Sequence, residues 1–191
     1  MAERAGHQIV LLDKLPGSCR AISSPNDPLL MVLEHPYQPK IMHRIAHELV
    51  ELELRATGTW TRHELEEGAQ YGGAALILPP NEFLGTVYEE NFDVAALRRR
   101  WPFASYELIV SRIADLLQHA AGASWTNRAL KFRHLRHDAA MPPGGELLEQ
   151  VALEKAQRHG RADLRFGGVR AAAWLLNPRG QSRAVSLCLA A

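Results

Sequence analysis

The residues best suited to chemistry form the run H-E-L-V-E, from His47 to Glu51, within a stretch whose pattern is typical of a helix. This run differs at one position from the zinc-peptidase signature H-E-x-x-H. In that signature two histidines four residues apart bind zinc on one helical face, and the glutamate accepts a proton from zinc-bound water. His47 and Glu48 match the first two positions, and Glu51 stands where the second histidine would be. The pattern predicts an altered metal site or the remnant of one.

Glu51 can serve this site in more than one way. Its carboxylate oxygens lie as many bonds from Cα as Nε2 of a histidine, so it can reach a metal bound by His47. One histidine with two carboxylates would acidify bound water less than two histidines with one carboxylate do, and would weaken the preference for zinc over harder ions such as manganese or magnesium. His43, four residues before His47, can supply a replacement nitrogen. Alternatively, Glu51 pairs with Arg55 one turn later and holds no metal.

Composition indicates an ordinary globular protein. The 191 residues are 47% hydrophobic and 23% charged, and the net charge of +1 gives no bulk attraction to nucleic acid or anionic membrane. The two cysteines, Cys19 and Cys188, show no paired secretory spacing. We therefore expect a reduced, cytoplasmic chain without a signal peptide or membrane segment. The basic stretch from Arg128 to His137 is better explained as a solvated helix face than as a nucleic-acid contact.

The elements around the run H-E-L-V-E follow from hydrophobic periodicity and turn residues. A helix from about residue 40 to 58 carries Ile45, Leu49 and Leu52 on one face. Thr61 and Glu64 form a capping-box pattern that opens a second helix, which ends at Pro79. The small residues of this helix, such as Gly72 and Gly73, predict close packing against the first helix. The other expected elements are strands at 8–12, 19–22 and 29–34, helices at 81–88, 94–100 and 106–120, a basic helix within 125–137, a helix at 146–159, and a hairpin of strands 170–176 and 183–190 around a turn at 177–180.

The order of these elements resembles the ImmA/IrrE family of metallopeptidases. The second helix reads E-E-G-A-Q-Y-G-G-A-A-L-I-L-P over residues 66–79, similar to the family pattern E-x-E-A-N-x-F-A-A-x-L-L-M-P. A later segment, F-A-S-Y-E at 103–107 followed by S-R-I at 111–113, is similar to F-x-V-S-x-x-A-x-x-x-R-L. The similarity extends over about residues 8–120. It implies a cytoplasmic regulatory zinc protease that cleaves a helix-turn-helix repressor.

The resemblance also implies roles for individual residues. His47 would be a zinc ligand, Glu48 the general base, and Glu51 the replacement for the second histidine ligand. The third ligand in the family is an acidic residue on the second helix. In the family pattern this acidic residue comes immediately before an alanine that corresponds to Ala69 in this chain. Gly68 stands at that position here, so the candidates are Glu67 and, as an alternate, Glu66. His43 is a further alternate ligand.

These observations predict an α+β fold, in which a small N-terminal sheet packs on a helical zincin-like domain over residues 1–121. Residues 122–191 are expected to form a C-terminal extension of a basic helix, a helix and a β-hairpin. The function implied is a metallopeptidase with a degenerate motif, holding zinc, manganese or no metal. The alternatives are a catalytically inactive regulator that binds a protein partner, or a structural component docked by its C-terminal hairpin. Because little chain precedes Gln8, we expect the helix-turn-helix partner to be a separate protein.

Overall fold

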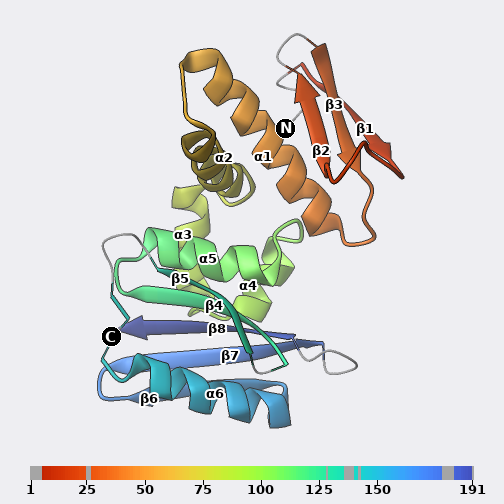
Figure 1. Ribbon diagram of the computed structural model, residues 1–191. Coiled ribbons are helices and arrows are strands. Elements are labelled where there is room, and N and C mark those ends of the chain that lie inside the picture. The colour runs from red at the N-terminus through yellow and green to blue at the C-terminus, as the bar shows by residue number, and fades with distance from the viewer. Residues whose placement is uncertain are drawn as a thin grey trace. The chain divides into compact units, whose positions relative to one another are not determined.

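The computed structural model describes residues 6–24, 27–127, 129–135, 140–141, 143–177 and 183–190. Over these residues the fold is α+β, with six helices, a three-stranded sheet and a five-stranded sheet (Figure 1). The fold class predicted from the sequence is therefore confirmed. The chain divides into two compact units: residues 1–79 with 101–105 form unit 1, and residues 80–100 with 106–191 form unit 2. No helix in the described part of the chain combines the length and the apolar character needed to cross a membrane.

Unit 1 contains the expected small sheet. Its strands are β1 (Gln8–Leu12), β2 (Ala21–Ser24) and β3 (Asp27–Leu33), in the order β1-β3-β2. The central strand β3 runs parallel to β1 and antiparallel to β2. The prediction located all three strands, with β1 at its predicted bounds and the ends of β2 and β3 displaced by one or two residues.

One face of the first helix, α1 (Gln38–Thr57), packs on this sheet. Ile41 and Ile45, one turn apart, are buried against Leu30 and Val32 of β3. Proline in the first turn lacks the N–H that a helix start leaves unpaired, so it is compatible with this helix start. The apolar stripe seen in the sequence thus fixes which face of α1 meets the sheet. In the run H-E-L-V-E, Glu48 lies toward β2 of this sheet, whereas His47 and Glu51 lie toward α2 or along α1.

The second helix, α2 (Arg62–Ile77), begins at the capping box that the sequence predicted. The Glu64 backbone N–H donates to Thr61 Oγ1 at 3.3 Å, and the Thr61 backbone N–H donates to Glu64 Oε2 at 2.8 Å. Two backbone donors that a helix start leaves unpaired are therefore satisfied. This cap sets the residue at which α2 starts.

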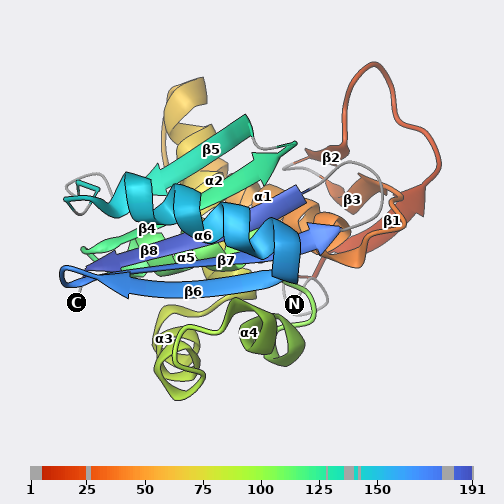
Figure 2. The same cartoon turned by 90° about the horizontal axis from the view of Figure 1, so that it is seen from below.

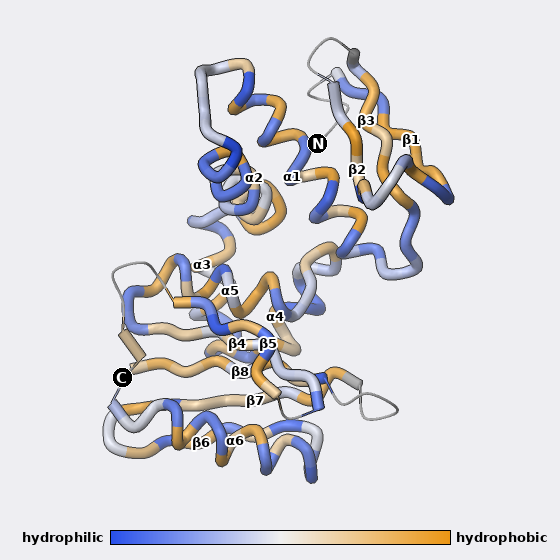
Figure 3. The backbone as a smooth tube through the Cα atoms, viewed as in Figure 1, coloured by the Kyte–Doolittle hydropathy of each residue, from blue (hydrophilic) through white to orange (hydrophobic). Residues whose placement is uncertain are grey.

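The elements of unit 2 are α3 (Pro80–Glu89), α4 (Val94–Arg100), α5 (Tyr106–Leu116), β4 (Ala120–Thr126), β5 (Ala129–Leu135), α6 (Gly145–His159), β6 (Arg161–Phe166), β7 (Val169–Asn177) and β8 (Arg183–Ala190). Its strands form an antiparallel sheet in the order β5-β4-β8-β7-β6. Helix α5 packs on one face of this sheet and helix α6 on the other (Figures 1 and 2). The α6 face is largely alanine, including Ala152 and Ala156 of the helix, so the helix approaches the strands closely. Apolar residues run along β7 and β8 (Figure 3).

The C-terminal region corrects the expectation of a basic helix within 125–137. Residues 125–126 instead end β4 and residues 129–135 form the strand β5. Residues 161–166 form a strand, β6, that the sequence analysis did not predict. The boundary expected between residues 121 and 122 lies inside β4, which pairs with β8. The predicted strands at 170–176 and 183–190 are confirmed as β7 and β8, while residues 178–180 of the predicted turn lie outside the described residues.

A buried polar chain explains part of the basic stretch. Glu149 of α6 is fully buried and pairs with Arg133 of β5, with 2.6 Å between Oε2 and Nη2. Ser186 Oγ donates to Glu149 Oε1 at 2.5 Å and accepts from Trp125 Nε1 at 2.8 Å. A buried carboxylate requires such partners, because an unpaired charge in the interior is strongly destabilising. Arg133 therefore has a structural role within unit 2.

Candidate functional site

The close approach of α1 and α2 creates the candidate site in unit 1. A Cβ atom added to Gly73 would lie 3.0 Å from the backbone nitrogen of His47 and 3.2 Å from the carbonyl carbon of Ala46. At Gly72 it would lie 2.7 Å from Cγ1 of Val50. Only glycine fits this contact without displacing a neighbour, so the predicted close packing of the two helices is confirmed. The contact places α2 directly beside the backbone of His47.

Two carboxylates flank the imidazole of His47. Its Nε2 lies 3.7 Å from Oε2 of Glu51 on the same helix and 3.8 Å from Oε1 of Glu66 on α2. The side chains of His47 and Glu51 are 15% and 17% exposed, whereas that of Glu66 is 71% exposed. The structure therefore brings together His47, Glu51 and the alternate candidate Glu66.

The leading candidate for the third ligand lies elsewhere. Oε1 of Glu67 is 3.4 Å from Nε2 of His63, its neighbour one turn earlier, and both side chains are mostly exposed. One residue along a helix rotates the side chain by about 100°. Glu66 therefore lies beside His47 of α1, whereas Glu67 lies beside His63 of its own helix, and both carboxylates are largely exposed.

Glu51 forms an ion pair with Arg55. Its Oε1 pairs with Nη2 of Arg55, one turn further along α1, while its other oxygen faces His47. This is the ion pair that the sequence analysis gave as the alternative to a ligand role, and it is confirmed. A guanidinium beside this carboxylate opposes the binding of a metal cation there, because like charges repel.

Glu48, the candidate general base, contacts the sheet. Its Oε2 accepts a hydrogen bond of 2.7 Å from Ser23 Oγ of β2, and both side chains are partly buried. The bond ties α1 to β2. The hydroxyl proton of Ser23 thus takes one of the lone pairs with which Glu48 would accept a proton from water.

His43 faces α2 in the neutral form. The side-chain nitrogen of Gln70 lies 3.3 Å from His43 Nε2, and because an amide nitrogen only donates, the ring accepts. Burial, with a smaller contribution from His47, lowers the pKa of His43 below 6.5. The rings of His43 and His47 stack with centroids 6.4 Å apart. His43 therefore has the unprotonated nitrogen of a metal ligand, but this nitrogen is occupied by Gln70.

As placed, His47, Glu51 and Glu66 are spread somewhat more widely than the ligands of one tetrahedral zinc ion. Ligands at about 2.0–2.1 Å from a tetrahedral zinc lie about 3.4 Å apart, which is less than the distances from His47 to either carboxylate. Binding would also require Glu51 to leave Arg55 and the exposed Glu66 to become ordered. Within the described ranges, no group of three or more His, Cys, Asp or Glu side chains is placed to hold a metal ion. The arrangement is a histidine between two carboxylates, stabilised by hydrogen bonds and ion pairs.

Two residues of this site were not among the sequence-based candidates. Gln70 follows Glu66 by one turn of α2, so helical periodicity alone could have placed both on the face that meets α1. Ser23 carried no such signal, because its contact with Glu48 joins elements 25 residues apart. Predicting it would have required the packing of α1 on the sheet.

The fold and site define an α+β protein in which one unit carries a histidine–carboxylate cluster and the other an antiparallel sheet with helices on both faces. No protein-family model matches this chain, and no curated protein sequence matches it. Among solved structures, the fold is similar to that of a Mycobacterium tuberculosis transcriptional regulator, with a TM-score of 0.69 and 17% sequence identity. The match covers 100% of this chain and 67% of the regulator. At this identity the similarity establishes a shared fold.

Proposed function

We propose that this chain is a regulatory protein of the ImmA/IrrE type that binds a protein partner without cleaving it. One observation carries the proposal: Glu51, at the position of the second zinc-binding histidine, is paired with Arg55. A peptidase of this type needs that position to hold the metal that activates water. The hydrogen bond from Ser23 to Glu48 is a second observation in favour, because it engages the candidate general base.

The partner we propose is a separate helix-turn-helix repressor, as the family resemblance implies. The similar fold of a protein described as a transcriptional regulator supports a role in controlling gene expression. In this proposal unit 1 recognises the repressor and changes its availability through binding alone. The polar face of α1 and α2, with His47, Glu66 and Gln70, would supply hydrogen bonds to the partner.

Complementation of a deletion strain tests this proposal. The strain would receive the wild-type chain or Glu48→Gln, and transcript levels would be compared across the genome. Glutamine keeps an oxygen that can accept from Ser23 but cannot act as a general base. We expect both chains to restore the same transcript profile. A Glu48→Gln chain that folds normally, accumulates to the wild-type level and restores nothing would contradict the proposal.

A second candidate is a metal-dependent peptidase, favoured by the convergence of Glu51 and Glu66 on His47. In this case His47, Glu51 and Glu66 would hold a zinc or manganese ion, and the ion would supply an activated water. Glu51→His provides the discriminating experiment, measured as zinc affinity by calorimetry. If a weakened metal site persists, this variant should bind zinc at least tenfold more tightly than the wild-type chain. Unchanged affinity would argue against this candidate.

A further inference from the structure

Unit 2 contains a cavity of about 620 Å³ that none of the site residues above touches. It is lined by the end of α3, the segment after α5, the β6–β7 turn and the end of β8. Its volume lies within the roughly 300–1,000 Å³ typical of small-molecule sites. All of its lining residues belong to unit 2, so the cavity is a property of that unit alone.

Aromatic side chains dominate the mouth of the cavity. Phe166 is 81% exposed and Tyr88 is 58% exposed, which are high values for large apolar side chains. The rings of Tyr88 and Phe92 meet edge to face, with centroids 5.5 Å apart. Leu117 and Leu189 also line the cavity. Exposed rings around an apolar hollow favour a flat apolar ligand, because binding would remove their surface from water.

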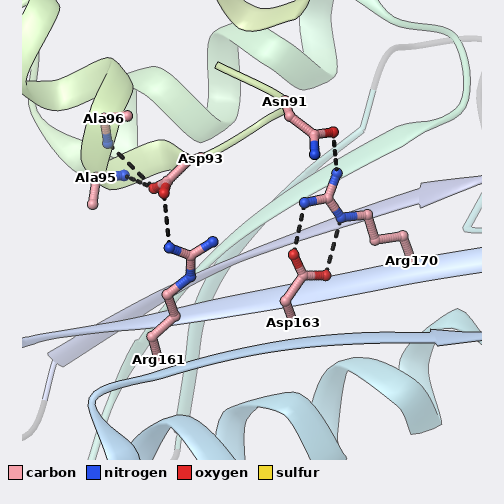
Figure 4. A network of polar contacts seen from close by, with 7 residues as sticks. All are labelled: Asn91, Asp93, Ala95, Ala96, Arg161, Asp163 and Arg170. Carbon is pink, nitrogen blue, oxygen red and sulfur yellow. Dashed lines mark hydrogen bonds and ion pairs between the residues drawn. The ribbon is translucent and has the colours of Figure 1, made fainter.

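Hydrogen bonds and ion pairs connect the segments that line the cavity. Arg170 donates to Asp163 through two hydrogen bonds, of 3.0 and 2.7 Å, and to Asn91 Oδ1 at 3.0 Å (Figure 4). The same guanidinium lies over the ring of Phe92, 6.0 Å from its centroid. Arg161 pairs with Asp93 at 2.7 Å, so two arginines of the β6–β7 hairpin hold the segment between α3 and α4 (Figure 4). A prearranged site loses less entropy on binding.

Backbone conformation on both sides of the mouth supports a binding role. Gly167 and Gly168 have φ values of 56° and 77°, which make the tight two-residue turn that presents Phe166. Across the cavity, Phe92 has a φ of 61°, an uncommon value for a bulky residue. Such strain concentrates at ligand sites, where surrounding structure maintains it.

The charged residues at the mouth of the cavity indicate the sign of the ligand's charge. The lining includes Arg165, Arg170 and His119 but no aspartate or glutamate. The charge of Arg170 is balanced by Asp163. Arg165 is exposed and acts on Asp163 through space, but that carboxylate is hydrogen-bonded to Arg170, and among the described residues no carboxylate forms a direct ion pair with Arg165. One guanidinium at the mouth is therefore available for an anion, and carboxylates are bound by arginine with particular geometric fit.

We propose that this cavity binds an aromatic monocarboxylate, with its flat body among Tyr88, Phe92 and Phe166 and its carboxylate on Arg165. The site is distinct from the cluster around His47 and is independent of whether that cluster binds a metal. It gives the chain a place at which a small anionic metabolite can be sensed.

A pair of matched probes tests the proposal by calorimetry on the full chain. 2-Naphthoate is an aromatic monocarboxylate, and 2-naphthamide has the same rings without the charge. We expect naphthoate to bind with one-to-one stoichiometry and about tenfold more tightly than naphthamide, because a charge-assisted hydrogen bond to Arg165 is lost in the amide. Absence of naphthoate binding at millimolar concentration, or equal affinity for the two probes, would overturn the proposal.

Three variants assign the binding to this cavity. Arg165→Gln should remove the preference for naphthoate, whereas Arg165→Lys should retain most of it. Phe166→Ala should weaken both probes by about tenfold, because part of the apolar contact is lost. Arg158→Gln, a change of another arginine outside the cavity, should affect neither probe. An unchanged preference in Arg165→Gln, with the fold verified by circular dichroism, would show that the probes bind elsewhere and overturn the assignment.

Discussion

Replacing Gly73 by alanine tests whether α1 and α2 pack as closely as described. The added Cβ would meet three backbone atoms: the nitrogen of His47 at 3.0 Å, and the carbonyl carbon of Ala46 and Cα of His47 at 3.2 Å each. Backbone atoms cannot move aside as the end of a flexible side chain can. The helices must therefore separate or shift to accept the methyl group.

The expected change in the unfolding free energy of Gly73→Ala is the sum of two opposing effects. Alanine stabilises a helix interior by about 0.8–1.0 kcal/mol relative to glycine, while overpacking a tight contact costs about 1–3 kcal/mol. Gly85 of α3 provides the matched control, because a Cβ added there would have no neighbour within 4 Å. Gly85→Ala should therefore gain only the stabilisation that alanine gives a helix interior relative to glycine. The difference in unfolding free energy between the two variants should therefore equal the overpacking cost, about 1–3 kcal/mol in favour of Gly85→Ala.

Urea unfolding at equilibrium measures this difference. Because the chain contains two compact units, circular dichroism and tryptophan fluorescence should both be recorded, and the transitions of the two units fitted separately if they do not coincide. Equal stabilisation in Gly73→Ala and Gly85→Ala would refute the close contact. It would also remove the reason for placing Glu66 beside His47.

Three further predictions concern unit 2. A hydrogen bond to Asp115 raises the pKa of His134 above its ordinary value of 6.5. The pair of protonated His134 and Asp115 should therefore stabilise the fold below about pH 6.5. This contribution to the unfolding free energy should be lost as pH rises through the pKa of His134 in the folded chain. The stability advantage of the wild-type chain over His134→Gln, measured by urea unfolding, should accordingly shrink as pH rises from 6.5 through the raised folded pKa, and a constant difference would contradict the assignment. Burial raises the pKa of Cys188 to about 11, so in an aromatic disulfide assay at about pH 8 the exposed Cys19 should react rapidly and Cys188 only after unfolding. Arg133→Met leaves the fully buried Glu149 without its cation and should destabilise unit 2 by about 3–5 kcal/mol. The double variant Arg133→Met with Glu149→Leu should recover much of this loss. An Arg133→Met chain as stable as the wild type would argue against a buried ion pair.

The parts of the fold that could be predicted are those with strong local signals. The capping box of Thr61 and Glu64 located the start of α2, and the short apolar run within Gln8–Leu12, followed by turn residues, located β1. The strand β4 gave no such signal, because its sequence A-A-G-A-S-W-T consists mostly of small residues and is buried along nearly its whole length. Its identity as a strand depends on pairing with β8, whose residues lie more than 50 positions later.

The candidate site was predictable where one helix determines the spacing. His47 and Glu51 are one turn apart on α1, so their proximity followed from the sequence. The choice between Glu66 and Glu67 did not, because it depends on the rotation of α2 against α1, which Gly72 and Gly73 help to set. The cavity of unit 2 was beyond sequence analysis for a related reason: Tyr88, Phe166 and Leu189 meet only after the sheet has formed.

The central claim that we propose is that His47, Glu51 and Glu66 do not form a catalytic metal centre. The metal content of the purified chain after dialysis, measured by elemental mass spectrometry beside His47→Ala, tests it most directly. We expect both proteins to contain only traces of zinc and manganese, at equal levels. One equivalent of either metal in the wild-type chain, lost in His47→Ala, would contradict the claim and favour the peptidase.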